Sequence, residues 1–171
     1  SLCRHHMKTF GTTQRHIAAV AAKNHQHSVH NPYSQFRKPF TIDEVLAAPP
    51  ISYPLTLPMC SAMSDGAAAA IVCSEEGLQR IGADRARAVR VAASVVRSFT
   101  LRSMDEPQRH ATHLAAQAAY AQAGLGPEDM DVAEVHDASA MGEICGFVHL
   151  LGGIKGFQSI ADTPVEDWDF T

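Results

Sequence analysis

The chain lacks three features that would assign a protein to a class at once: closely spaced cysteines, a long apolar run and a surplus of one charge. Its four cysteines lie far apart with no Cys-x-x-Cys spacing, so neither a zinc ribbon nor a dense disulfide framework is predicted. The longest apolar stretches, such as AAAAIVC at 67–73, are far shorter than the ~20 residues of a membrane-spanning helix. A net charge of -4 with scattered Lys and Arg argues against nucleic acid or an anionic membrane as a partner.

Length and cysteine usage bound the number of domains and the compartment. A chain of 171 residues with 46% hydrophobic side chains fits one ordinary domain or a large piece of a bigger protein. The first residues, SLCRHHMKTF, lack the apolar core of a secretory signal, and the last ones, EDWDFT, do not match a peroxisomal address. We therefore expect a cytoplasmic protein with reduced cysteines.

Hydrophobic periodicity and turn residues predict an α/β chain. Three apolar runs are typical of buried strands, at 67–73, 88–96 and 131–136. Amphipathic patterns predict helices at 12–26, 41–48, 75–82, 105–126 and 139–153. Between residues 88 and 136 a strand, a helix and a strand follow one another, which is the order of a parallel sheet.

Local residues mark several helix ends. Thr12 or Thr13 is a natural N-cap for the first predicted helix, and 41–44 carries a capping-box pattern. Ser74 is expected to cap the third helix, and Gly124 is expected to end the fourth.

One dipeptide is a candidate for chemistry. His136 and Asp137 follow the predicted strand 131–136 directly, and side chains at the carboxyl end of such strands face the functional edge of a sheet. A neutral imidazole there can position water or donate a hydrogen bond to an oxyanion. The pattern alone leaves open a plain strand-to-turn pair in which Asp137 only caps the next helix.

Three segments together resemble the thiolase superfamily. They are HMKTFGTTQRHIAAVAAKNHQHSVHNPYSQFR at 6–37, MSDGAAAAIVCSEEG at 63–77 and AEVHDASAMGE at 133–143. The resemblance is closest to sterol-carrier-protein-x type thiolases and thiolase-like lipid-transfer proteins, and it covers roughly residues 4–150. The third segment of that group reads His-Asp-Cys-Phe, whereas here His136 and Asp137 are followed by Ala138 and Ser139.

The resemblance implies a thiolase-like α/β fold, in which a mixed sheet is flanked by helices. Family members have two similar halves, and this chain resembles a middle slice of them. Residues 1–87 would form the loop excursion over coenzyme A and the end of the N-terminal half. Residues 88–171 would form the start of the C-terminal half. We therefore expect the chain to be incomplete, as a fragment, a truncated gene product or the ordered part of a longer polypeptide.

The resemblance also implies acyl transfer, in which a cysteine thiolate takes the acyl group from a thioester and an oxyanion hole stabilises the thioester oxygen. By position, His136 would hold an oxyanion-hole water and Asp137 would orient neighbouring groups. The nucleophilic cysteine would precede residue 1, and the later Gly-His-Pro and Cys-x-Gly motifs are missing after residue 145. We therefore expect the chain alone to be inactive.

The loop that the family uses near coenzyme A would contain Tyr33, Phe36 and Arg37. Arg37 could pair with a phosphate and an aromatic ring could pack on adenine, although an ordinary surface loop explains these residues nearly as well. Coenzyme A would enter as part of a thioester substrate. No permanently bound cofactor is expected.

Other reactive residues have simpler interpretations. Cys60 is either a thiolate near substrate or, as we favour, a buried small hydrophobe, and Cys73 is expected in the core. His25, His27 and His30 lack acidic or cysteine partners at familiar spacing, so a polar surface loop is favoured over a metal site. Glu143 could lie near His136, one turn into the last helix; the alternative is an exposed helix carboxylate.

Two classes of function remain. The first is a thiolase-type acyltransferase acting on 3-ketoacyl-CoA thioesters in lipid or sterol metabolism, represented by an incomplete chain. The second is a non-catalytic thiolase-like component that binds acyl-CoA or braces a partner subunit. A retro-aldol reaction, as in some thiolase-like lipid-transfer proteins, is a further possibility within the enzyme class. Unpaired apolar edges predict a homo-oligomer or a complex with a partner subunit.

Overall fold

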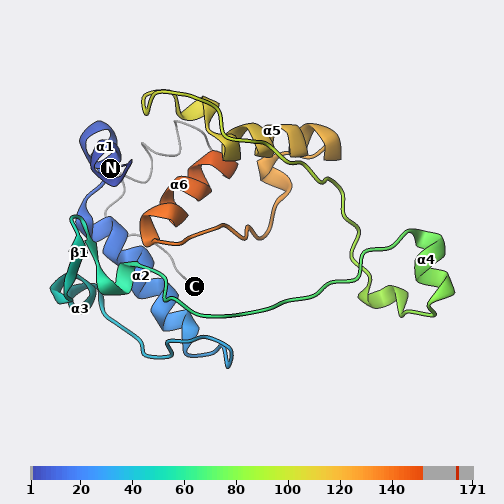
Figure 1. Cartoon of the computed structure of the whole chain (residues 1–171), viewed down its shortest axis with the longest axis horizontal. Coiled ribbons are helices and arrows are strands. Elements are labelled where there is room, and N and C mark those ends of the chain that lie inside the picture. The colour runs from blue at the N-terminus through green and yellow to red at the C-terminus, as the bar shows by residue number, and fades with distance from the viewer. Residues whose placement is uncertain (1, 152–164, 166–171) are drawn as a thin grey trace.

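The computed structural model describes residues 2–151 and Val165, and helices dominate the described part (Figure 1). The longer helices are α1 (Leu2–Phe10), α2 (Gln14–Ser28), α5 (Ala111–Ala123) and α6 (Ala140–Leu151). Helix α6 packs between α2 and α5. Helix α1 is not among the helices that the sequence predicts. Among the described residues, no helix combines the length and the apolar character needed to cross a membrane.

Helix α2 begins where two side chains satisfy its first backbone groups. The Thr13 hydroxyl accepts a hydrogen bond from His16 N–H at 3.3 Å, and the His16 ring accepts one from Thr13 N–H at 3.0 Å. Thr13 is therefore the N-cap, which confirms one of the two alternatives. The next two turns pack inward, and their buried residues are His16, Ile17, Ala18, Ala19, Val20, Ala21 and Ala22.

Helix α3 (Ile42–Ala47) starts with the predicted capping box. Thr41 N–H donates to the Glu44 carboxylate at 2.8 Å, and Glu44 N–H donates to the Thr41 hydroxyl at 3.2 Å. The hydrogen bond from the Thr41 backbone holds the pKa of Glu44 below its ordinary value.

A short hairpin connects α3 to the core. Strands β1 (Pro50–Ser52) and β2 (Leu55–Thr56) pair antiparallel, and the 3₁₀ turn η1 (Leu57–Met59) follows. The Thr56 hydroxyl donates to the Val45 carbonyl at 2.7 Å in a buried setting, so the hairpin is fixed to the end of α3. The hairpin and η1 belong to a proline-rich connection, residues 49–64, whose η1 turn packs against α2.

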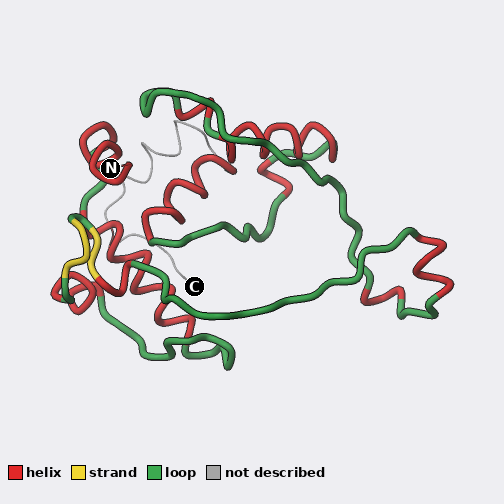
Figure 2. Tube along the Cα trace, in the orientation of Figure 1, coloured by secondary structure: helices red, strands yellow, loops and turns green. Residues whose placement is uncertain are grey.

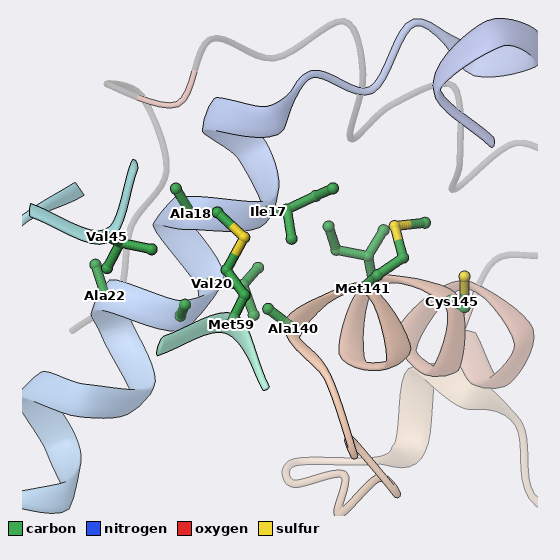
Figure 3. Packing of buried hydrophobic residues seen from close by; sticks show 11 residues of the cluster. Ile17, Ala18, Val20, Ala22, Val45, Met59, Ala140, Met141 and Cys145 are labelled. Atoms are coloured by element: carbon green, nitrogen blue, oxygen red, sulfur yellow. The ribbon is translucent and has the colours of Figure 1, made fainter. Parts of the chain in front are cut away.

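The hydrophobic core lies where α2, α3, η1 and α6 meet (Figure 3). Ile17 and Val45 have no exposed surface, and Met59 and Met141 expose 2% each. Burying side chains of this size contributes roughly 1.5–3 kcal/mol each. The alanines of α2 and Ala140 let the two helices approach around these larger residues.

Helix α5 packs on α6 and ends as predicted. Gly124 adopts a left-handed conformation, with φ 69°, and its N–H donates to the Tyr120 carbonyl at 2.9 Å. The Tyr120 hydroxyl donates to the Leu150 carbonyl of α6 at 3.2 Å. The start of α5 is later than predicted, because Pro107 begins a separate 3₁₀ turn, η3 (Pro107–Arg109).

Helix α4 (Glu75–Arg80) lies apart from the other helices, at the tip of two extended arms (Figure 1). The predicted cap is confirmed, since the Ser74 hydroxyl accepts a hydrogen bond from Gly77 N–H at 3.1 Å. A 3₁₀ turn, η2 (Arg85–Arg87), follows, and Arg85 forms an ion pair with Glu75.

The three predicted strands are not paired in this structure. Segments 67–73, 88–96 and 131–136 run as extended loops, and β1 with β2 forms the only sheet among the described residues (Figure 2). A strand needs a neighbour for its backbone N–H and C=O groups, and no other strand lies beside these segments within the described part. The strand predictions for these three segments are therefore wrong for this chain by itself, and its sheet within the described part is the β1–β2 pair.

The side chains of these segments are correspondingly exposed. Ile71 is 85% exposed, Val89 is 90% exposed and Val132 is 81% exposed. Cys73, expected in the core, is exposed as well, so that prediction is wrong for the same reason. Apolar side chains that alternate as in a strand but remain exposed indicate a surface on which another segment normally packs.

Candidate functional site

The segment that carries His136 and Asp137 is joined to the proline-rich connection. Ser61 N–H donates to the Ala138 carbonyl at 3.1 Å, and Cys60 pairs with Ser139 as an isolated antiparallel bridge. The Ser139 hydroxyl accepts a hydrogen bond from Gly142 N–H at 3.3 Å, so Ser139 occupies the N-cap position of α6. The N-cap role that the sequence offered to Asp137 belongs to Ser139.

Two glycines let α6 lie close to this segment. A Cβ added at Gly142 would lie 3.5 Å from the Asp137 Cα, and one added at Gly146 would lie 3.3 Å from the Val135 Cβ. Residues four apart share a helix face, so α6 presents a smooth glycine face to residues 135–137. The glycines that interrupt the predicted helix therefore position the His136–Asp137 dipeptide.

A polar cluster ties the same segment to α2. Asn24 donates from Nδ2 to Glu143 Oε2 at 2.7 Å and, over a longer distance of 3.5 Å, to Asp137 Oδ2. Lys23 forms an ion pair with the other oxygen of Glu143. The side chains of Lys23 and Glu143 are only 22% and 13% exposed, so this pair is partly shielded from water. Glu143 thus lies at the site, and it is not the exposed helix carboxylate of the alternative interpretation.

An open cleft of about 310 Å³ lies beside the cluster. Its walls are the second half of α2, residues 34–36, residues 58–64 and the start of α6. Asn24 and Asp137 supply polar groups to the lining, and Phe36 supplies an aromatic ring. A cleft with a few polar groups and an apolar wall suits a small organic ligand.

Only one of the two predicted catalytic residues lines the cleft. Both residues are exposed, but Asp137 lines the cleft and His136 does not. His136 stands one residue from the cleft, on the same segment. Its role as holder of an oxyanion-hole water stays a prediction.

Only one of the three residues predicted to contact coenzyme A lines the cleft. Phe36 lines the cleft and is 53% exposed. Tyr33 is 94% exposed, and Arg37 donates to the Val29 carbonyl at 3.1 Å within its own loop; neither belongs to the lining. The structure therefore brings Phe36, but not Tyr33 or Arg37, to the cleft.

Of the other candidates, Cys60 and His25 line the cleft, and the remaining histidines lie on the surface. Cys60 is half-buried and lines the cleft, so it is not the fully buried hydrophobe that we favoured. The His25 ring lies 3.2 Å from the Pro58 carbonyl and packs edge-on against Phe40, while His27 and His30 are exposed. Among the described side chains, no group of three or more metal-ligating residues comes together.

Burial keeps one nearby thiol protonated. The pKa of Cys145 is raised to about 12, first by burial and then by proximity to Cys3. The pKa of Cys3 is raised as well, chiefly by burial. Neither group is an activated thiolate.

Sequence reasoning missed Lys23 and Asn24. The available signal was the change from alanine to adjacent polar residues in the last turns of an otherwise apolar helix. It did not reveal the partners, because Asn24 and Glu143 are 119 positions apart in the chain.

Comparison with known proteins shows the family to which the chain is related. Residues 93–153 match the family described as "Thiolase C-terminal domain-like". The chain is 39% identical over 147 residues to "Sterol carrier protein 2" of Rattus norvegicus, covering 82% of this chain and 27% of that protein. It is 37% identical over 141 residues to "Benzoylsuccinyl-CoA thiolase subunit BbsB" of Thauera aromatica, covering 81% and 36% respectively.

The chain belongs to the thiolase superfamily. A solved structure, "Ltp2-ChsH2(DUF35) aldolase", has a TM-score of 0.68 at 23% identity over 96% of this chain and 45% of its own, so the fold is thiolase-like. The "Acetyl-CoA acetyltransferase" of Methanothermobacter thermautotrophicus is 34% identical, covering 92% of this chain and 42% of that protein. The chain spans about a quarter to two fifths of the length of these curated relatives.

Proposed function

We propose that this chain supplies the oxyanion corner and part of the ligand cleft of a thiolase-type acyltransferase acting on 3-ketoacyl-CoA thioesters in lipid or sterol metabolism. The observation that carries the proposal is the cleft itself, which is lined by both Asp137 and Phe36 and lies beside the His136 segment. Two relatives bear names that denote reactions of coenzyme A thioesters, which supports the same class of substrate.

Each residue has a task in this proposal. The His136 imidazole holds a water whose O–H donates to the thioester oxygen as negative charge develops there. Asp137 orients the polar groups at the cleft, and Phe36 packs against an apolar part of the substrate. Tyr33 and Arg37 lie on the same loop as Phe36, and they are candidates for contact with the nucleotide part of coenzyme A.

A second candidate is a thiolase-like binding subunit without its own nucleophile. It is supported at two of the four cysteines, because burial raises the pKa of Cys3 and of Cys145 and a protonated buried thiol does not attack a thioester. Such a subunit would bind acyl-CoA and contribute its corner to a site completed by a partner or a second copy. A cytoplasmic location stays a prediction in both cases.

Calorimetric titration of the purified chain with acetoacetyl-CoA tests the shared part of both candidates. Saturable binding is expected, and Phe36→Ala should weaken it roughly three- to tenfold, or about 0.7–1.4 kcal/mol. His30→Gln serves as the control, because His30 is exposed and does not line the cleft. If the wild-type chain shows no saturable binding, or if both variants bind equally, the cleft is not the acyl-CoA site.

Product analysis separates the candidates. Incubation with acetoacetyl-CoA and coenzyme A yields acetyl-CoA if the polypeptide performs thiolysis, and this product should fall when His136 is replaced by alanine. Binding without acetyl-CoA supports the non-catalytic subunit. Release of a ketone or aldehyde from a β-hydroxyacyl-CoA, without consumption of coenzyme A, would indicate the retro-aldol reaction instead.

A further inference from the structure

The His136–Asp137 segment is held chiefly by contacts that do not come from a sheet. Residues 131–136 form no strand pairing within the described part of the chain. The backbone contact with the proline-rich connection, from Ser61 to Ala138, comes after the dipeptide. The direction of the Asp137 carboxylate therefore depends on side-chain contacts.

One of these contacts is made by Asn24. Its Nδ2 group lies 2.7 Å from a Glu143 oxygen and 3.5 Å from an Asp137 oxygen, so a single amide faces two carboxylates from different segments. An amide NH₂ has two donors, which matches two acceptors. It can therefore hold together two negative groups that would otherwise repel one another.

Lys23 completes the arrangement from the other side. Its ammonium group pairs with Oε1 of Glu143, and Asn24 donates to Oε2 of the same carboxylate. With Glu143 fixed by Lys23, Asn24 is fixed in turn, and its remaining donor faces Asp137. Adjacent residues of α2 thus hold the start of α6 and the segment before it in one geometry.

We propose that Asn24 is a positioning residue, which holds the Asp137 carboxylate toward the cleft, next to His136 in the chain. This inference rests on the proposed function for its catalytic meaning. The geometric part concerns only the chain itself. A thioester bound in the cleft would meet Asp137 in the direction that Asn24 imposes.

Replacing the amide by a carboxylate tests the contact with little change in shape. Asn24→Asp removes both donors and places a third negative group beside Glu143 and Asp137. Gln26→Glu is the matched control, because it makes the same amide-to-acid change on the same helix at an exposed position outside the cleft. Both variants alter the net charge equally, so a difference between them reports the contact.

The first readout is NMR spectroscopy of the purified chain. We expect Asn24→Asp to shift the backbone amides of residues 136–140 and the His136 ring resonance, while Gln26→Glu leaves them in place. The double variant Asn24→Asp with Glu143→Gln restores an amide–acid pair between positions 24 and 143 but leaves a carboxylate at position 24 facing Asp137, so these resonances should stay shifted. Their return to the original positions would show that Asn24 only ties α2 to α6, and it would refute the positioning of Asp137.

The second readout is the affinity for acetoacetyl-CoA. We expect the Kd to rise by about fivefold or more in Asn24→Asp and to change by less than about twofold in Gln26→Glu. If Asn24→Asp does not fold, Asn24→Ser, which keeps a small neutral donor, takes its place in both measurements.

The outcomes distinguish the two proposals. If the wild-type chain does not bind acetoacetyl-CoA but Asn24→Asp shifts residues 136–140 as described, the positioning stands and the proposed function fails. If binding occurs and Asn24→Asp changes neither these resonances nor the Kd, the positioning role is refuted. Equal effects of Asn24→Asp and Gln26→Glu would also refute it, because they would show a response to charge alone.

Discussion

Acid should destabilise the chain through buried histidines at the α5–α6 contact, and His149 is the clearest case. It is 7% exposed, and its ring stacks on that of His110, with centroids 4.4 Å apart and planes at 5°. The pKa of His149 is lowered to about 4, first by burial and then by the positive charges of His110, His113, Arg102 and His6.

The direction of the pH dependence follows from this lowered value. An unfolded histidine takes up a proton near pH 6.5, whereas folded His149 stays neutral down to about pH 4. Between these values the unfolded chain binds more protons, so stability is complete above about pH 6.5 and is lost as the pH falls. At pH 5 the linkage relation gives a loss of roughly 2 kcal/mol for this one group.

Urea unfolding followed by circular dichroism at pH 7.5 and pH 5 measures this loss. His149→Phe keeps an aromatic ring for the stack on His110 but removes the proton, so its free energy of unfolding should fall by roughly 2 kcal/mol less than that of the wild type. A smaller loss should remain in the variant, because the pKa of His6 is also lowered to about 4, chiefly by burial. If His149→Phe loses as much stability as the wild type, the assigned protonation behaviour is wrong; exposed His30→Gln should behave as the wild type does.

Three further substitutions test the packing. Ile17→Ala removes a fully buried side chain from the core and should cost about 2–5 kcal/mol of unfolding free energy in the same urea assay. Gly146→Val should cost about 1–3 kcal/mol, because even a Cβ at this position lies 3.3 Å from the Val135 side chain; thermal unfolding that matches the wild type would show that α6 does not approach residues 135–137. Thr13→Ala removes the cap of α2 and should lower stability by about 1 kcal/mol, whereas Thr13→Ser, which keeps the hydroxyl, should lower it far less.

The sequence predicts the helices better than the strands because the two depend on different information. Thr13, the Thr41–Glu44 pair, Ser74 and Gly124 act on backbone groups within a few positions, so their patterns specify helix ends locally. The segments 88–96 and 131–136 carry strand patterns too, but a strand is completed by residues far away or outside the chain. Their apolar side chains consequently remain exposed here.

The candidate site likewise combines features that depend on neighbouring residues with features that depend on distant ones. Residues 136–137 could be located from the sequence, because an apolar run and a following helix cap are local signals. The cleft could not, because it arises where α2, residues 58–64 and the start of α6 meet through contacts between distant parts of the chain. The partners of Lys23 and Asn24 could not be predicted for the same reason, because Glu143 is 119 positions from Asn24 in the chain.

The two glycines of α6 and the polar cluster together position residues 135–137. An extended segment without a paired neighbour gains little orientation from its own backbone, so its position must come from whatever packs on it. Gly142 and Gly146 allow α6 to approach residues 135–137 closely, which sets the distance. Asn24 then sets the direction in which Asp137 points. A neighbouring strand added by a partner would order residues 131–136 further, but it would find the His136–Asp137 corner already in place.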